Sequence, residues 1–221
     1  MTQNLPLVGL LIIGITALIS YKGFRDDSFF TAYSFQINKI RSGSYLRLLS
    51  SGFLHVGTSH LLFNMITLYF FIGIVVYALG TFSFLALYFG SLIAGNLFGY
   101  GYHYNDPYYT AVGASGAVTG VLFSALLLYP EIELFLFFIP IPIPGYLFGI
   151  GYILYTLYGM KSQKDTIGHT AHFGGAIGGI VITLLLKPEV LDEATLMLTV
   201  LSVATLVAGI MLYREQQKKR N

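Results

Sequence analysis

The sequence predicts an all-α polytopic membrane protein. Of its 221 residues, 55% are apolar and only 10% are charged, and the mean hydropathy is +0.72. In a typical soluble domain roughly a quarter of the residues are charged, so the low charged fraction here is typical of a membrane protein instead. Apolar runs of about 20 residues recur along the chain, which is long enough for about six or seven spans. We therefore expect a single membrane domain over residues 1–221.

The expected spans follow from these runs, taken in order. They are residues 5–21, 59–79, 81–102, 115–130, 145–160, 168–186 and 194–213. The first is expected to be retained rather than cleaved, because no Lys or Arg precedes it. The last is expected to be a seventh span, with an interfacial helix as the alternative. Prolines at 140, 142 and 144 cannot continue a helix, so residues 138–145 are expected to be irregular.

The segment between the first two spans mixes charged and apolar residues at helix-like spacing. Within it, residues 45–54 carry several leucines together with Arg47. We expect an interfacial, partly inserted element with Arg47 anchored at the membrane boundary.

Ser115 lies between glycines at the start of the fourth apolar run, in the sequence GASG of residues 113–116. In the first turn of a helix, backbone N–H groups lack partners in the helix and favour developing negative charge. This position suits a nucleophile whose intermediate is an oxyanion. Alone the pattern is weak, because small residues of this kind often simply pack membrane helices together.

His60 and Asn64 open the second span, in the sequence HLLFNM of residues 60–65. Residues four apart lie on one face of a helix, so both side chains present hydrogen-bonding groups in the same direction. A single polar residue in a membrane helix commonly bonds to a neighbouring helix. Two on one face favour a functional role, because such residues are costly in hydrocarbon.

Small residues four apart form a ridge on the fourth and on the sixth span. The ridges are Gly116 and Gly120 on the fourth, and Ala171, Gly175 and Gly179 on the sixth. Such ridges let two backbones approach closely. That approach would bring Ser115 within hydrogen-bond reach of His172, which adjoins the second ridge. His169 is expected to be an interfacial residue, and His103 an exposed loop histidine.

These residues can be given chemical roles. Ser115 is the predicted nucleophile, and neutral His172 is the base that takes its proton and later protonates the leaving amine. His60 and Asn64 can donate hydrogen bonds to a tetrahedral oxyanion, beside the backbone N–H of Ser115. No Asp or Glu lies at the active end of any span as a clear third member of a triad, so the sequence predicts a Ser–His dyad.

In this combination the sequence resembles the rhomboid family of intramembrane serine proteases. The resemblance is carried by residues 60–65, 113–116 and 171–175, each opening an apolar span, and it covers about residues 45–186. It implies a six-helix core at about residues 5–187, with an extra C-terminal transmembrane helix at about 194–213. The dyad of Ser115 and His172 and an oxyanion site including His60 and Asn64 are implied as well.

The resemblance also has implications for activity. It implies a water-accessible cavity within the bilayer and cleavage of transmembrane substrates near the membrane boundary. The fifth span and residues 161–166 would form a gate and a cap over the site. The expected partners are transmembrane-protein substrates and the lipid bilayer, and the expected location is the bacterial inner membrane.

The chain departs from the family pattern at three places. Thr119 stands where relatives often place an aromatic residue that stacks on the catalytic histidine. Leu46 precedes Arg47 where relatives often have tryptophan, and residues 73–80 lack the acidic residue often found there. None of these departures removes a reacting group.

The distribution of basic residues leaves the orientation open. If all seven spans cross, the N-terminal side holds only Lys187. The other side holds Lys22, Arg25, Lys39, Arg41, Arg47, Lys161, Lys164, Arg214, Lys218, Lys219 and Arg220. The positive-inside rule then places the active-site end in the cytoplasm. Resemblance to bacterial rhomboids implies the opposite side.

Other classes of function compete with the protease. A rhomboid-like binding or quality-control protein without proteolysis is the main alternative, and a small transporter or channel is another. Residues 113–117 are not the elbow of soluble hydrolases, and no HExxH motif indicates a zinc site. No basic stripe favours nucleic acid. We therefore expect neither a cofactor nor a metal.

Overall fold

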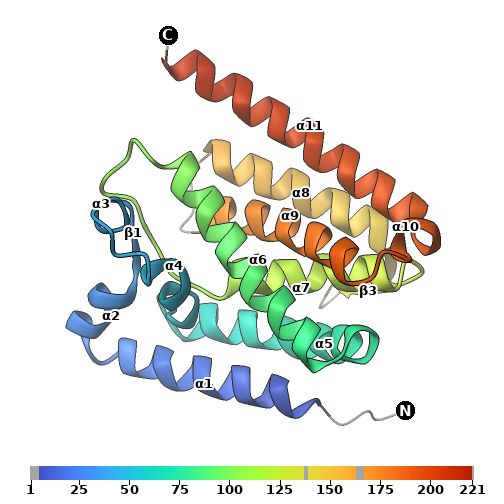
Figure 1. Cartoon of the computed structure of the whole chain (residues 1–221), viewed down its shortest axis with the longest axis horizontal. Helices are drawn as coiled ribbons and strands as arrows, with labels where there is room; N and C mark the ends of the chain where they lie inside the picture. The colour runs from blue at the N-terminus through green and yellow to red at the C-terminus, as the bar shows by residue number, and fades with distance from the viewer. Residues whose placement is uncertain (1–4, 137–138, 163–166, 221) are drawn as a thin grey trace.

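The computed structural model describes residues 5–136, 139–162 and 167–220. These residues form a bundle of helices with two small antiparallel sheets (Figure 1). The long helices are α1 (Leu7–Gly23), α5 (Thr58–Leu79), α6 (Thr81–Tyr102), α7 (Ser115–Leu128), α8 (Gly145–Ser162), α9 (His169–Leu186) and α11 (Thr195–Arg220). The short elements are α2 (Asp27–Tyr33), β1 (Phe35–Gln36), α3 (Ile37–Arg41), α4 (Arg47–Ser50), a 3-10 turn (Ser51–Phe53), β2 (Thr110–Ala111), β3 (Glu133–Leu136), β4 (Ile139–Pro144) and α10 (Val190–Glu193).

The long helices confirm the all-α polytopic membrane class. Within the described part of the chain, four helices are long and apolar enough to cross a membrane by length and composition: Thr58–Leu79, Thr81–Tyr102, His169–Leu186 and Thr195–Arg214. Leu7–Gly23 and Ser115–Leu128 are shorter apolar helices. Each predicted span coincides with one long helix, and the ends agree to within a few residues except that α11 extends to Arg220.

Helix α7 lies at the centre of the bundle. Every one of its residues from Gly116 to Leu128 is buried, while Ser115 at its first position is half-buried. Helices α5, α6 and α9 pack around it, and α1 and α11 lie on opposite outer sides of the bundle (Figure 1). With 14 residues, α7 is about 21 Å long, shorter than the ~30 Å hydrocarbon core. If α7 is oriented across the bilayer, at least one of its ends lies within the hydrocarbon core rather than at its surface.

The segment between α1 and α5 folds back onto the bundle. The Nη1 atom of Arg47 donates to the carbonyl oxygens of Thr31 at 2.8 Å and Ser34 at 2.6 Å. Asn96 of α6 donates to the carbonyl oxygen of Leu48 at 2.7 Å. Leu54 is fully buried. Arg47 therefore anchors the segment by capping backbone carbonyls.

The proline-rich run was expected to be irregular, and that prediction is wrong for residues 139–144. They form β4, which pairs antiparallel with β3 in the register Leu134↔Ile143. Gly145, which directly follows Pro144, donates its N–H to the carbonyl oxygen of Ile132 at 2.8 Å. Alternate residues of a strand face the same neighbour, so the N–H groups that face β3 come from the residues between the prolines. Pro144 consequently points its ring nitrogen away from the partner strand, where no donor is needed. The cap expected at residues 161–166 falls largely on residues 163–166, outside the described residues.

Candidate active site

The N-terminus of α7 presents Ser115 at the end of a tight turn. Gly113 has φ of +134°, a conformation that side chains rarely adopt. Its N–H donates to the carbonyl oxygen of Ser51 at 3.0 Å, which connects the turn to the segment between α1 and α5. The hydrogen-bonded helix of α7 begins where the N–H of Val118 donates to the carbonyl oxygen of Ala114, so the N–H groups of Ser115 and Gly116 precede it. They are available to an anion beside Ser115.

Helices α7 and α9 meet along their glycine ridges, as the sequence predicted. A Cβ atom on Gly116 would lie 3.2 Å from the carbonyl oxygen of Ala171. One turn further along, a Cβ on Gly175 would collide with the carbonyl oxygen of Gly116. The backbones therefore touch, and they do so beside Ser115 on α7 and beside His172 on α9. The contact brings the predicted nucleophile and base to the same end of two adjacent helices.

His172 is buried, with 9% of its surface exposed, and its ring is held by a tyrosine. The hydroxyl of Tyr152 on α8 lies 3.1 Å from Nδ1 of His172 and 2.8 Å from Oγ1 of Thr119. The rings of Tyr152 and His172 stack with centroids 6.0 Å apart and an angle of 26° between their planes. Sequence reasoning missed Tyr152, because α8 carries several tyrosines and no pattern separates this one. Thr119 was the one sequence feature that could have indicated such a residue. It stands where relatives often have the aromatic neighbour of the histidine, so an aromatic contact could be sought on another helix.

His60 and Asn64 lie on the side of α5 that faces the α7 turn. A Cβ on Gly113 would stand 3.0 Å from Nε2 of His60 and 3.7 Å from Oγ of Ser115. The ring edge of His60 and the Ser115 hydroxyl therefore both lie beside the backbone of Gly113. Asn64 is 4% exposed, and its Nδ2 donates to the carbonyl oxygen of His60 at 3.0 Å, which leaves its second N–H for another acceptor.

A second buried histidine supports the turn, and the sequence did not single it out. His55 is fully buried, and its Nδ1 lies 2.8 Å from Oγ of Ser20. That hydroxyl donates to the carbonyl oxygen of Phe53 at 2.8 Å, so it accepts from His55. The N–H of Ala114 donates to Nε2 of His55 at 3.4 Å. Burial, followed by the neighbouring His60, lowers the pKa of His55 to about 3, so its ring is neutral.

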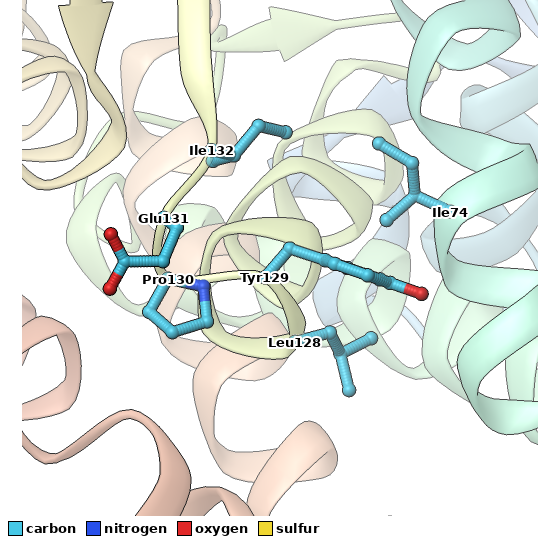
Figure 2. A pocket seen from close by; sticks show the side chains of 6 residues that line it. All are labelled: Ile74, Leu128, Tyr129, Pro130, Glu131 and Ile132. Carbon is cyan, nitrogen blue, oxygen red and sulfur yellow. The ribbon is translucent and has the colours of Figure 1, made fainter.

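Ser115 lines neither of two cavities found in the described part of the structure. One of about 370 Å³ is lined by Ile74, Leu128, Tyr129, Pro130, Glu131 and Ile132. Figure 2 shows Tyr129 reaching toward Ile74 while the Glu131 carboxylate points the other way. This cavity is at the C-terminal end of α7, opposite Ser115, and is mainly apolar, so we assign it no part in the chemistry.

A second cavity, of about 240 Å³, lies near the start of α9. Its lining includes His103, Asp106, His169 and Thr170. The expectation that His103 is exposed is wrong: the ring is half-buried and stacks on Tyr109 with centroids 3.5 Å apart. Burial lowers the pKa of His103 to about 4, against the opposing effect of Asp106. His169, the first residue of α9, is buried within the protein, with 4% of its surface exposed.

With this geometry in hand, comparison with known proteins identifies the family. The profile of the Rhomboid domain matches residues 42–189, about two thirds of the chain. The chain belongs to the rhomboid family. The matched region contains all four predicted site residues: His60, Asn64, Ser115 and His172. This rhomboid is accordingly a multi-pass membrane protein of a family that includes proteases.

Individual relatives come from bacteria and from mitochondria. Rhomboid protease AarA of Providencia stuartii is 32% identical over 193 residues, which cover 78% of this chain and 67% of AarA. RHOMBOID-like protein 12, mitochondrial, of Arabidopsis thaliana is 29% identical over 76% of this chain and 54% of its own length. Rhomboid protein 1, mitochondrial, of Saccharomyces cerevisiae is 30% identical over 62% of this chain and 41% of its own length. This rhomboid thus spans about half the length of these two mitochondrial relatives.

Proposed function

We propose that the protein is an intramembrane serine endopeptidase that cleaves transmembrane proteins near the membrane boundary. The observation that carries the proposal is the contact between α7 and α9, which puts half-buried Ser115 and buried His172 at one end of two touching helices. The likeness to Rhomboid protease AarA supports the same reaction class. Transmembrane substrates and the bilayer are the proposed partners.

The reaction proceeds by acyl transfer to a serine. Oγ of Ser115 attacks the scissile carbonyl while its proton passes to Nε2 of His172. The resulting oxyanion accepts hydrogen bonds from the N–H of Ser115 and from the side chains of His60 and Asn64. When the C–N bond breaks, His172 returns the proton to the leaving amine. Water, deprotonated by His172, then attacks the carbonyl of the acyl-enzyme. As the bond from that carbonyl to Oγ of Ser115 breaks, His172 returns the proton to Oγ and the second product leaves as an acid.

The dyad acts without a carboxylate partner. In a triad, a buried aspartate holds the histidine in the correct tautomer and stabilises the imidazolium. In the proposed dyad, the developing negative charge is stabilised by the helix N-terminus and by neutral hydrogen-bond donors.

The proposed organisation is one membrane domain over residues 1–221. Its core comprises about residues 5–187, and the extra C-terminal helix at about 194–213 crosses the membrane outside that core. We propose the bacterial inner membrane as its location, while the relatives include both bacterial and mitochondrial proteins. The orientation of the active-site end is decided by accessibility labelling of cysteines introduced at either end of α7.

A cleavage assay tests the proposal. The purified protein, reconstituted in lipid vesicles, is incubated with a transmembrane substrate beside Ser115→Ala and His172→Ala. We expect cleavage by the unaltered protein and a loss of roughly a thousandfold or more in either variant. Undiminished cleavage by a folded variant would contradict the dyad. Absence of cleavage by the unaltered protein would favour a rhomboid-like binding or quality-control protein.

A further inference from the structure

Tyr152 of α8 joins the predicted base to the helix that carries the predicted nucleophile. Its hydroxyl lies within hydrogen-bond distance of both His172 Nδ1 and Thr119 Oγ1. Thr119 follows Ser115 by four residues, so it lies one turn below the serine on the same face of α7. We propose that Tyr152 positions His172 for catalysis, in the place that a carboxylate takes in a triad. The inference rests on the proposed protease function.

The direction of the two hydrogen bonds follows from the chemistry. For Nε2 of His172 to accept the serine proton, Nδ1 must carry the hydrogen of the neutral ring. The oxygen of Tyr152 then accepts from Nδ1–H, and the phenol hydrogen is left to be donated to Oγ1 of Thr119. The chain of donors runs from His172 through Tyr152 to Thr119 and selects one tautomer.

The same bond strengthens during the reaction. When His172 takes the proton from Ser115, its ring becomes a cation, and its Nδ1–H bond to Tyr152 becomes charge-assisted. A hydrogen bond to a charged group contributes more than a bond between neutral groups. Tyr152 therefore stabilises the state in which His172 is charged, in addition to fixing the ring before it.

Packing around the tyrosine ring keeps its hydroxyl in place. Phe123 of α7 contacts the Tyr152 ring at a centroid distance of 5.8 Å, and Phe148 of α8 lies at 6.2 Å. The ring of His172 stacks against it as well. Thr119 is 2% exposed, and its small side chain leaves room for the phenol between the helices. The aromatic contact thus comes from α8 rather than from α7.

The position of Tyr152 makes the site depend on how α8 is seated. Helix α8 lies between α9 and α11 (Figure 1) and packs chiefly against these two helices. A Cβ on Gly149 would stand 2.5 Å from Leu201 of α11, so this contact is close. A displacement of α8 away from α9 would withdraw the hydroxyl from His172.

Four variants of the full chain test the inference. They are Tyr152→Phe, Thr119→Val, the double variant, and Tyr158→Phe as the matched control, since Tyr158 lies on α8 with 62% of its surface exposed. Two rates are measured. The first is the labelling of Ser115 by a fluorophosphonate, a small probe whose reaction does not require a transmembrane helix to enter the site. The second is the cleavage of a transmembrane substrate, with kcat and KM determined separately. Thermal unfolding checks that each variant is folded.

We expect Tyr152→Phe to lower both the labelling rate and kcat by roughly 10- to 100-fold, with KM changed by less than about twofold. Thr119→Val should lower them by about 2- to 10-fold, because it removes only the second bond of the chain. The double variant should be no slower than Tyr152→Phe, since the two groups act through one chain. Tyr158→Phe should match the unaltered protein.

The outcomes separate the inference from the proposed function. A reactive unaltered protein with an equally reactive Tyr152→Phe would overturn the positioning role alone. A rise in KM with kcat unchanged would also overturn it, because Tyr152 would then serve substrate binding. If Tyr152→Phe does not fold, Thr119→Val carries the test, and an unchanged rate in it overturns the inference. An unreactive unaltered protein would overturn the proposed function and the inference together.

Discussion

Gly175 of α9 lies directly against the carbonyl oxygen of Gly116 in α7, so closely that a Cβ atom at position 175 would collide with that backbone. Backbone atoms cannot turn away as a flexible side chain can, so Gly175→Ala must push the two helices apart. Overpacking of this kind costs about 1–3 kcal/mol. We expect a lower unfolding temperature together with a large loss of activity, because the separation occurs one turn from the dyad.

The matched control for this substitution is Gly73→Ala on α5. A Cβ there meets no atom within 4 Å, so the same chemical change has no steric consequence. Thermal unfolding and cleavage assays on both variants provide the measurement. Equal stability and activity of the two variants would show that α7 and α9 do not touch at this point.

The turn before Ser115 depends on His55. Removing its ring in His55→Ala leaves the buried N–H of Ala114 without its acceptor and Ser20 without a donor. An unsatisfied buried group costs about 1–3 kcal/mol, so we expect the variant to unfold at a lower temperature and to react more slowly. The adjacent Val56→Ala, at a position 65% exposed, is the control and should change neither property. A stable, fully active His55→Ala would contradict the supporting role.

The stacked pair of His103 and Tyr109 predicts a pH dependence of stability. Burial lowers the pKa of His103 from 6.5 to about 4, so the folded protein favours the neutral ring. The stabilisation is complete above about pH 6.5 and is lost progressively as the pH falls toward 4, because the unfolded chain takes up the proton first. The unfolding temperature, measured over this range, should fall more steeply for the unaltered protein than for His103→Phe, which retains a stacking ring. Parallel curves would show that His103 does not contribute.

The rate at which a transmembrane substrate is cleaved should depend on the local stability of its helix near the cut. An intact helix hides its carbonyl groups in hydrogen bonds, so attack by Ser115 requires local unwinding. We expect a transmembrane substrate with glycine or proline near the cut to be cleaved faster than the same segment built from leucine. Mass spectrometry of the products provides the rate and the cleavage site together. Efficient cutting inside an unbroken polyleucine helix would argue against this requirement.

Local patterns were sufficient to predict much of this structure. The apolar runs predict the positions of the long helices. A segment that crosses the hydrocarbon core must satisfy its backbone hydrogen bonds internally, and a helix does so over about 20 residues. The two glycine ridges predicted the contact of α7 with α9, since small residues four apart leave one face free for a second backbone. Ser115 and His172 follow from their places beside those ridges.

The features that sequence analysis missed depend on long-range packing. Tyr152 contacts His172 only because α8 is placed against α9, and nothing in the sequence of α8 separates it from the other tyrosines. His55 belongs to no pattern that marks it in the sequence, yet it is buried because the segment between α1 and α5 packs against the α7 turn. The prolines of β4 predict irregular backbone when only their effect on helices is considered, whereas their alternation matches the alternating outward positions of a strand.

The central claim is that Ser115 is an activated nucleophile. Its most direct test is labelling of the purified protein with a fluorophosphonate, followed by mass spectrometry to locate the modified residue. We predict one modified residue, Ser115, and loss of the modification in both Ser115→Ala and His172→Ala while the variants remain folded. A well-folded protein that is not labelled, or one that is labelled equally after His172→Ala, would contradict the account.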